Sequence, residues 1–445
     1  MRILFLTQII PYPPDAGPKV KTWHVLRYLA ESGHQVILAS FIRPEEKAYV
    51  EALRRVCAEV YTVDIHRSRI LDMKYWLYSH LTGRPFLIER DDIAAMRQLI
   101  QKLLLNSSID CIQADQLTMA QYALPTSSPR SNHIFRKSNL SIDQKPYSKL
   151  QGVSPYLVFD AHNAVWSIVE RMSQTQPWYL RPVLKVESRR IKRYEGMVIH
   201  QFDHTLAVTE IDRENLLRAQ AAYTNGSSFS ALGKEVGDNR DRSRITVIPI
   251  SVDTNKIQPI VRKPNTVNIL TLGTLHYPPN ADGVRWFTRE VFPLIRQEMS
   301  NATLTIIGKN PPTDLVQLGA SDRAIEVTGY VPDLNPYLQQ AAMVIVPVRA
   351  GSGMRVRILE AFAFAMPVVT TTIGLEGIDA RPGVDVVVAD TPVDFANSVI
   401  EVLQNDSMQD QLAINGRSLA VERYDWQVAL RKLGKVYKTI ETSSS

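Results

Sequence analysis

The residues best suited to chemistry lie in one short segment of the second half of the chain. An apolar stretch runs into a turn with Gly351 and Gly353, and a helix that Pro367 ends is expected to follow. Glycines allow close approach of the backbone, and the start of a helix offers unpaired N–H groups. Arg355 and Arg357 add fixed positive charge. Together these features fit a diphosphate, although an ordinary strand-to-helix connection can show the same glycines.

Two further side chains have the chemistry of a sugar or nucleotide site. Glu360 is expected about two turns into the same helix, where its carboxylate could accept hydrogen bonds from both hydroxyls of a ribose. An ion pair with a nearby arginine is the alternative role of this carboxylate. His162 stands at the end of an expected strand, and a histidine there is either a structural residue or a group that faces a substrate.

Two series of alternating strands and helices are expected to position these residues. The expected strands of the first half are 3–6, 36–39, 111–114, 156–159, 204–208 and 245–250, with a helix over about 20–32. The expected strands of the second half are 269–272, 304–307, 325–327, 344–346, 368–371 and 386–388, followed by helices at about 393–403, 408–421 and 426–439. Such alternation predicts an α/β fold with two doubly wound, Rossmann-like lobes, which bind ligands at the carboxyl ends of their strands.

The expected division is an N-terminal lobe over 1–250, a C-terminal lobe over 251–423 and a final helix over 424–445 that returns to the first lobe. The linker is expected over 251–264. Residues 125–154 and 221–244 are rich in serine, asparagine, glycine and basic residues without apolar periodicity, and are expected to be mobile insertions in the first lobe.

The composition argues against a membrane-spanning protein. The chain has 445 residues, 45% hydrophobic and 22% charged, and no apolar run approaches the roughly 20 residues that cross a bilayer. We therefore expect a cytoplasmic protein.

Cys57 and Cys111 have no partners at metal-ligand spacing, and an Asp-x-Asp pair is absent, so we expect no metal and no cofactor. Residues 1–250 carry 33 Lys+Arg against 25 Asp+Glu (+8), and residues 251–445 carry 18 against 20 (−2), so an anionic partner should meet the first half.

The segment from Gly351 to Thr371 resembles the donor-site signature of the retaining, two-lobed glycosyltransferases of family four, the group 1 glycosyltransferases. Glu360-Ala361 and the segment Pro367-Val368-Val369-Thr370 match the second half of that signature. The first glutamate of the signature would fall at Ser352. The form Gly-Ser-Gly-Met-Arg-x-Arg-Ile-Leu-Glu is similar to a subgroup associated with exopolysaccharide assembly.

The resemblance extends over nearly the whole chain, through segments at 13–17, 26–36, 160–163, 193–210, 248–253 and 273–280. It implies catalytic roles for His162, Arg355 and Arg357. It implies donor binding by Gly17, Lys21, Gly273, Thr274, Tyr330, Val331, Ser352, Gly353, Met354 and Glu360. Lys21 would be a lesser phosphate ligand, the backbone at Tyr330 and Val331 would hold the base, and Ser352 would leave room for the sugar.

The resemblance implies transfer of a sugar from a nucleoside-diphosphate sugar to a glycan or lipid-linked acceptor, with retention of configuration and without a metal, in exopolysaccharide or cell-surface polysaccharide synthesis. No nucleic acid partner is expected. A catalytically silent scaffold and a nucleotide-sugar epimerase of the same fold remain alternatives.

Aromatic residues beside cations indicate peripheral contact with the inner face of a membrane. The aromatic segments are Tyr75-Trp76-Leu77-Tyr78 and Trp178-Tyr179-Leu180-Arg181, and the basic residues that follow are Lys185, Arg189, Arg190, Lys192 and Arg193. Such a surface fits anionic lipids, but a solvated helix face with buried aromatics would show the same pattern.

Overall fold

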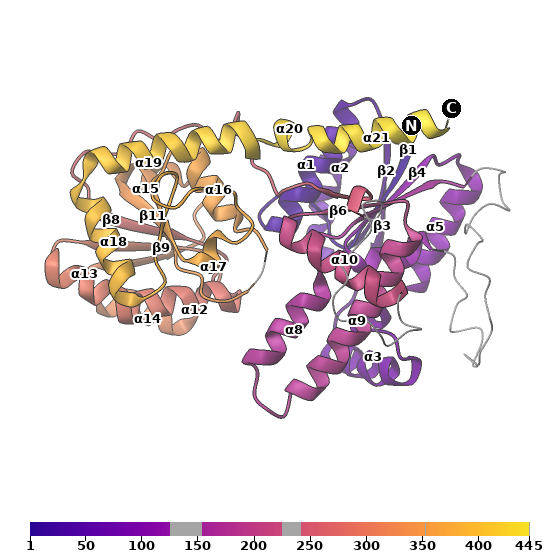
Figure 1. Cartoon of the computed structure of the whole chain (residues 1–445), viewed down its shortest axis with the longest axis horizontal. Helices are drawn as coiled ribbons and strands as arrows, with labels where there is room; N and C mark the ends of the chain where they lie inside the picture. Colours follow the sequence, from indigo (N-terminus) through magenta and orange to yellow (C-terminus); the bar gives the residue numbers. More distant parts are fainter. Residues whose placement is uncertain (125–153, 225–241, 352, 445) are drawn as a thin grey trace. The chain divides into compact units, whose positions relative to one another are not determined.

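The computed structural model describes residues 1–124, 154–224, 242–351 and 353–444. The chain forms two compact units: Met1–Ile248 together with Leu430–Ser445 is unit 1, and Pro249–Ala429 is unit 2 (Figure 1). The boundary predicted from the sequence, at 250, lies two residues after the observed boundary at Ile248. The returning segment was predicted to begin at 424, whereas unit 1 resumes at Leu430. No helix in the described part of the chain is both long enough and apolar enough to cross a membrane.

Unit 1 is built on a seven-stranded parallel sheet with the order β3-β2-β1-β4-β5-β6-β7. Its strands are β1 (Arg2–Thr7), β2 (Gln35–Ile42), β3 (Glu59–Asp64), β4 (Cys111–Asp115), β5 (Tyr156–Asp160), β6 (His204–Ala207) and β7 (Ile245–Val247). The strand order reverses at β1, which pairs with β2 on one side and β4 on the other. The carboxyl ends of β1 and β4 therefore form the topological switch point, where ligands bind in such sheets.

The central strands of unit 1 are apolar and buried, so helices must cover both faces of the sheet. The helices are α1 (Gly17–Glu31), η1 (Pro44–Tyr49), α2 (Val50–Arg54), α3 (Arg69–Thr82), α4 (Phe86–Arg90), α5 (Ala94–Asn106), α6 (Leu117–Ala123), α8 (Val165–Thr175), α9 (Arg181–Gln201), α10 (Glu210–Thr224) and α21 (Arg431–Ser444).

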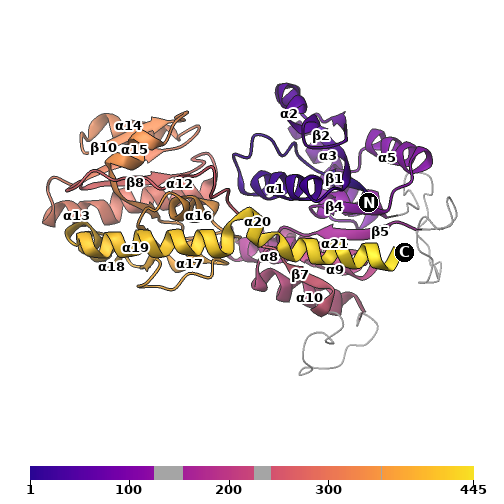
Figure 2. The same ribbon diagram turned by 90° about the horizontal axis from the view of Figure 1, so that it is seen from above.

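Helix α21 completes unit 1, although it follows the whole of unit 2 in the sequence (Figure 2). Leu433, Tyr437 and Ile440 are buried and share one face of the helix. The Tyr437 hydroxyl donates a hydrogen bond to Gln113 of β4. A Cβ on Gly434 would lie 2.4 Å from the Tyr28 hydroxyl of α1, so the glycine permits close packing of the two helices.

Unit 2 is built on a six-stranded parallel sheet with the order β10-β9-β8-β11-β12-β13. Its strands are β8 (Asn268–Leu272), β9 (Thr303–Ile307), β10 (Ile325–Gly329), β11 (Ala341–Val346), β12 (Val368–Thr370) and β13 (Val387–Val388). The helices are α12 (Pro278–Trp286), η2 (Phe287–Val291), α13 (Phe292–Glu298), α14 (Thr313–Ser321), α15 (Asn335–Gln340), α16 (Val356–Ala363), α17 (Thr372–Leu375), α18 (Pro392–Gln404), α19 (Asp406–Leu419), η3 (Ala420–Tyr424) and α20 (Trp426–Ala429). The switch point of this sheet lies between β8 and β11.

Three expectations about individual segments need correction. Strand β3 was not predicted, because its residues are only partly buried and give no continuous apolar run. Residues 221–224 continue α10, so the insertion expected from 221 does not begin there; residues 125–153 and 225–241 lie outside the described residues. The expected linker 251–264 packs on unit 2: Val252 bridges to Asp425, and the Ile260 N–H donates to the Phe364 carbonyl at 2.9 Å.

Candidate functional site

Two loops with predicted donor residues of unit 2 lie at the switch point of its sheet. Gly273 and Thr274 follow β8 directly, and the turn before α16 follows β11. The loops are packed closely here: a Cβ on Gly308 would lie 2.1 Å from the Gly273 carbonyl oxygen, and one on Gly283 would lie 2.1 Å from that of Pro347. Because neither position has room for a side chain, the backbone at this edge is held in place by packing.

The glycine turn has the backbone conformation that its sequence predicts. Gly351 and Gly353 adopt φ values of 109° and 85°, which L side chains rarely adopt. Arg355 is the N-cap residue of α16 and its Nη1 donates to the Gly353 carbonyl at 2.7 Å. Met354 is buried beneath the turn. The turn therefore brings an arginine and the N-terminus of an eight-residue helix together, which favours an anion. Ser352 lies outside the described residues.

Glu360 and Arg357 form an ion pair on α16, with Arg357 Nη1 donating to Glu360 Oε2 at 2.6 Å. This is the alternative role that the sequence left open for Glu360. Both side chains are partly buried, so the pair restricts the rotamers of the carboxylate and the guanidinium. An ion pair through one oxygen of Glu360 is compatible with further hydrogen bonds to the carboxylate, which has about four lone-pair sites.

Tyr330 and Val331 follow β10, which is two strands from the switch point. The Gly308 N–H donates to the carbonyl of Gly329 at 2.9 Å, so the end of β10 is tied to the end of β9. The Tyr330 side chain is 72% exposed, so it is not part of the core.

Thr370 and Thr371 belong to the same edge, although no role was predicted for their hydroxyls. Thr370 Oγ1 donates to the Val346 carbonyl at 2.7 Å, and the Thr371 hydroxyl donates to the Val348 carbonyl and caps α17 by accepting from Gly374 N–H at 2.8 Å. The two hydroxyls hold the chain that leaves β11 against the chain that leaves β12. The two adjacent threonines in the sequence could have indicated this capping role, since threonine favours a helix N-cap.

The switch point of unit 1 holds a buried group of polar side chains. Asp115 ends β4, Asp160 ends β5, and His162 follows two residues later. His162 Nε2 lies 2.6 Å from Asp115 Oδ1, and the hydroxyls of Thr7 and Thr22 donate to Asp115 Oδ2 at 2.7 and 3.0 Å. His162 is held at φ 56°, a left-handed conformation unusual for a residue with a side chain. The sequence predicted His162 but missed Asp115, for which the signal was an aspartate directly after an apolar strand.

Electrostatics stabilise the ionised form of Asp115. Burial opposes ionisation, but the charge and hydrogen bond of His162, the Thr7 hydroxyl and the charge of Lys21 together lower the pKa of Asp115 below its ordinary value. Asp160 pairs with Lys21, and its Oδ2 is buried without a hydrogen-bond partner among the described residues.

Lys21 does not have the placement expected of a phosphate ligand. Its side chain is 1% exposed and its ammonium pairs with Asp160. The lysine therefore neutralises a buried carboxylate that would be costly to leave unpaired. Gly17, the other donor residue expected in this loop, is the first residue of α1 and is partly buried.

Asp115, Asp160 and His162 could each offer a ligand atom to one metal ion, since these atoms lie within 4.8 Å of one another. The observed geometry fits a metal poorly. The Lys21 ammonium already provides a cation to Asp160. The 2.6 Å between His162 and Asp115 is a hydrogen-bond distance, whereas two adjacent ligands at about 2.1 Å from an octahedral ion lie about 3 Å apart. We therefore derive no chemistry from a metal here.

Comparisons with known proteins agree with this architecture. The family described as "Glycosyl transferases group 1" matches residues 266–405, within unit 2. A Klebsiella pneumoniae protein described as an uncharacterized 44.6 kDa protein in the cps region is 24% identical over 444 residues, covering 95% of this chain and 96% of its own. The structure of Anabaena HepE in complex with UDP and glucose has a TM-score of 0.62 at 13% identity, covering 99% and 100% of the two chains. Sucrose-phosphate synthase from Thermosynechococcus elongatus has a TM-score of 0.65 at 13% identity, covering 100% of both chains.

Two parallel-sheet units, each with polar residues at a switch point, give this chain the two-lobed fold of GT-B type that these solved structures share. Residues 266–405 of unit 2 are similar to the group 1 glycosyltransferases.

Proposed function

We propose that the protein transfers a sugar from a nucleoside-diphosphate sugar, bound by unit 2, to a glycan or lipid-linked acceptor, with retention of configuration and without a metal. The observation that carries the proposal is the glycine turn at the unit 2 switch point, with Arg355 at the N-cap of α16 and Arg357 and Glu360 on that helix. Uridine diphosphate is the first nucleotide to test, since the HepE structures hold UDP or UDP-glucose.

The chemistry follows from the charge that develops on the leaving nucleotide. As the bond between the sugar and the diphosphate breaks, negative charge grows on the leaving oxygen. Arg355, Arg357 and the N–H groups near Gly353 and at the start of α16 can stabilise this charge with little reorganisation, because Arg355 already donates to the Gly353 carbonyl and Arg357 to Glu360. We assign Glu360 to the ribose hydroxyls, Gly273, Thr274 and Met354 to the donor, and the backbone at Tyr330 and Val331 to the base.

Unit 1 is proposed to hold the acceptor, and His162 to hydrogen-bond the transferred sugar. The pair with Asp115 fixes the ring of His162, and the imidazole would present its other nitrogen to the sugar. The Klebsiella relative from a cps region supports a role in exopolysaccharide or other cell-surface polysaccharide synthesis.

A nucleotide panel followed by product analysis tests the proposal. Thermal shift with uridine, guanosine, adenosine and thymidine diphosphates should identify one that raises the melting temperature, because a ligand that binds only the folded state stabilises it. Transfer from the matching sugar donor should then survive a chelator, and NMR of the product should show the anomeric configuration of the donor. If no nucleoside diphosphate binds, a silent scaffold is favoured instead. Release of free nucleotide or sugar at full rate without an acceptor would indicate an epimerase.

A further inference from the structure

Helix α3 presents an apolar face to solvent. Ile70, Met73, Leu77 and Leu81 follow the three- and four-residue spacing of one helical face, and Ile70 and Leu81 are 78% and 84% exposed. Ser79, on the opposite face, is buried. A helix on the surface of a globular protein normally shows the reverse arrangement, with its apolar face toward the core. An outward apolar stripe of this kind marks a surface that contacts another molecule or a membrane.

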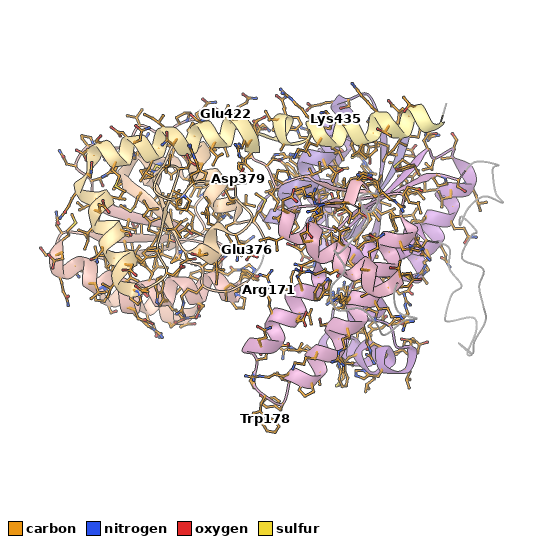
Figure 3. All side chains as sticks on the ribbon, in the orientation of Figure 1. Arg171, Trp178, Glu376, Asp379, Glu422 and Lys435 are labelled. Carbon is orange, nitrogen blue, oxygen red and sulfur yellow. The ribbon has the colours of Figure 1, made fainter. Side chains whose placement is uncertain are left out.

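The connection between α8 and α9 adds aromatic residues to this surface. Trp178 is 79% exposed and lies at the tip of the α8–α9 hairpin (Figure 3), with Tyr179 beside it. In Figure 1 this tip and α3 lie on the same side of unit 1, and α21 lies on the other. The Phe86 N–H, just after α3, donates to Glu187 Oε1 of α9 at 2.6 Å. This hydrogen bond joins the segment that follows α3 to α9 within unit 1.

The exposed charges of α3 and α9 have one sign. The exposed Lys, Arg, Asp and Glu side chains of these two helices are Arg69, Lys74, Arg181, Lys185, Arg189 and Arg193, and all are basic. Four of them recur at four-residue intervals along α9 and form a basic stripe. Two other basic residues of α9 have local partners: Lys192 lies 4.1 Å from the Trp166 ring centroid, and Arg190 pairs with Glu187.

We propose that this face, the apolar stripe of α3 with Trp178, Tyr179 and the basic stripe of α9, docks unit 1 on an anionic membrane surface. Apolar side chains and tryptophan enter the interface between headgroups and acyl chains, and lysine and arginine pair with anionic headgroups. A second copy of this chain fits the face poorly, because a two-fold contact would place one basic stripe against another. The inference deepens the proposed function, since a membrane surface is where a lipid-linked acceptor lies.

One of the two segments that the sequence indicated remains in this face: Trp178 and Tyr179, with the basic residues of α9. In the other segment Tyr75 and Tyr78 are only partly exposed, and Trp76, 39% exposed, has its ring centroid 4.4 Å from that of His80. The most exposed apolar residues of α3 are aliphatic.

The test is flotation of the full-length chain with vesicles of phosphatidylcholine, with and without phosphatidylglycerol. The wild type should float with the anionic vesicles only, and high salt should release much of it, because salt screens exposed charges. The charge variant R181Q/K185Q/R189Q/R193Q should bind about six-hundred-fold more weakly, since each of the four cations contributes roughly five-fold near an anionic surface. The apolar variant I70Q/M73Q/L77Q/L81Q should lose the binding that persists at high salt.

The chain offers a matched control on the other side of unit 1. Arg431, Lys432, Lys435 and Lys438 are four exposed cations of α21, and R431Q/K432Q/K435Q/K438Q removes the same charge from the same unit. This control should float like the wild type. An equal loss in the control and in the α9 variant would show attraction to net charge alone and would overturn the proposal. A concentration-dependent dimer that the apolar variant abolishes would also overturn the proposal, because a second copy of the chain would then cover the face.

Nucleotide binding separates this inference from the proposed function. Every variant above leaves unit 2 unchanged and should show the wild-type thermal shift with the nucleoside diphosphate. Flotation without nucleotide binding would refute the proposed donor and leave the docking face in place. Nucleotide binding by a wild type that does not float would refute the docking face alone.

Discussion

Asp115 accepts hydrogen bonds from groups that are far apart in the sequence. Thr7, Thr22 and His162 converge on its two oxygens, and Lys21 stands close enough for its charge to lower the pKa of the carboxyl. Because the pKa is lowered, the ionised form stabilises the folded state at any pH above the ordinary pKa of about 4. This contribution is lost only as the pH falls through the lower folded value. The carboxylate is therefore present throughout the neutral range to orient His162.

Asp115→Asn should lower turnover by roughly ten- to a hundred-fold, because a neutral amide with one acceptor oxygen and an N–H donor replaces the carboxylate that fixes the ring of His162. In a His162→Ala background the same change should have little further effect, since Asp115 is expected to act through the histidine. Steady-state kinetics of the four proteins measure this coupling. Equal effects of Asp115→Asn in both backgrounds would show that the aspartate serves only to stabilise unit 1.

Glu360→Gln should weaken nucleoside-diphosphate binding by about ten-fold or more, since charge-assisted hydrogen bonds to ribose contribute roughly 1.5–3 kcal/mol each. The ribose is remote from the reacting carbon, so KM should rise before kcat falls. Asp314→Asn is a matched control, because Asp314 forms an ion pair with Arg285 elsewhere in unit 2. Calorimetric titration should show near-wild-type affinity for the control. Unchanged affinity for Glu360→Gln would leave only the ion pair with Arg357 as the role of Glu360.

Among the elements, α21 shows how a distant segment stabilises unit 1. Leu433 is fully buried in that unit, so Leu433→Ala should destabilise it by about 2–5 kcal/mol. Hydrogen exchange should become faster in β1, β2 and α1, while exchange in the core of unit 2 changes little. The exposed Lys435→Ala is the control. If Leu433→Ala left exchange in unit 1 unchanged, docking of α21 would contribute little to its stability.

His204 of β6, whose Nε2 lies 2.9 Å from the Thr246 hydroxyl of β7, gives unit 1 a pH dependence. Burial, with a smaller contribution from the charge of Arg244, lowers the pKa of His204 from 6.5 to about 4. Neutral His204 therefore stabilises unit 1 above about pH 6.5, and this stability declines as the pH falls toward 4. His204→Gln should reduce the loss of unfolding free energy between about pH 7 and pH 5 by about 2 kcal/mol in urea titrations. The exposed His66→Gln should retain the wild-type slope, and an unchanged slope in His204→Gln would contradict the assignment.

At the scale of the whole molecule, the two units differ in how the chain builds them. Unit 2 is one continuous segment with its own core, whereas unit 1 needs both ends of the chain. A fragment of residues 249–429 should therefore fold and bind the nucleoside diphosphate with an affinity within about ten-fold of the full chain. Circular dichroism and calorimetry measure the two properties. A folded fragment that binds no nucleotide would show that unit 2 alone does not hold the donor.

The sequence by itself determined the features that depend on neighbouring residues. Apolar runs and their spacing predicted twelve of the thirteen strands found in the described residues, all except β3. The positive φ values of Gly351 and Gly353 and the short helix with Arg357 and Glu360 also follow from local chemistry, because glycine and the N-terminus of a helix act within a few residues.

Only the tertiary structure decided which distant groups meet. Asp115 and His162 are 47 residues apart and come together because β4 and β5 are parallel neighbours whose carboxyl ends share one edge. Lys21 was expected at a phosphate and instead pairs with Asp160, because α1 directs its side chain into the buried edge. The outward face of α3 was likewise decided by packing: a helical stripe in the sequence records which residues share a face, but the surrounding elements determine whether that face meets the core or the solvent.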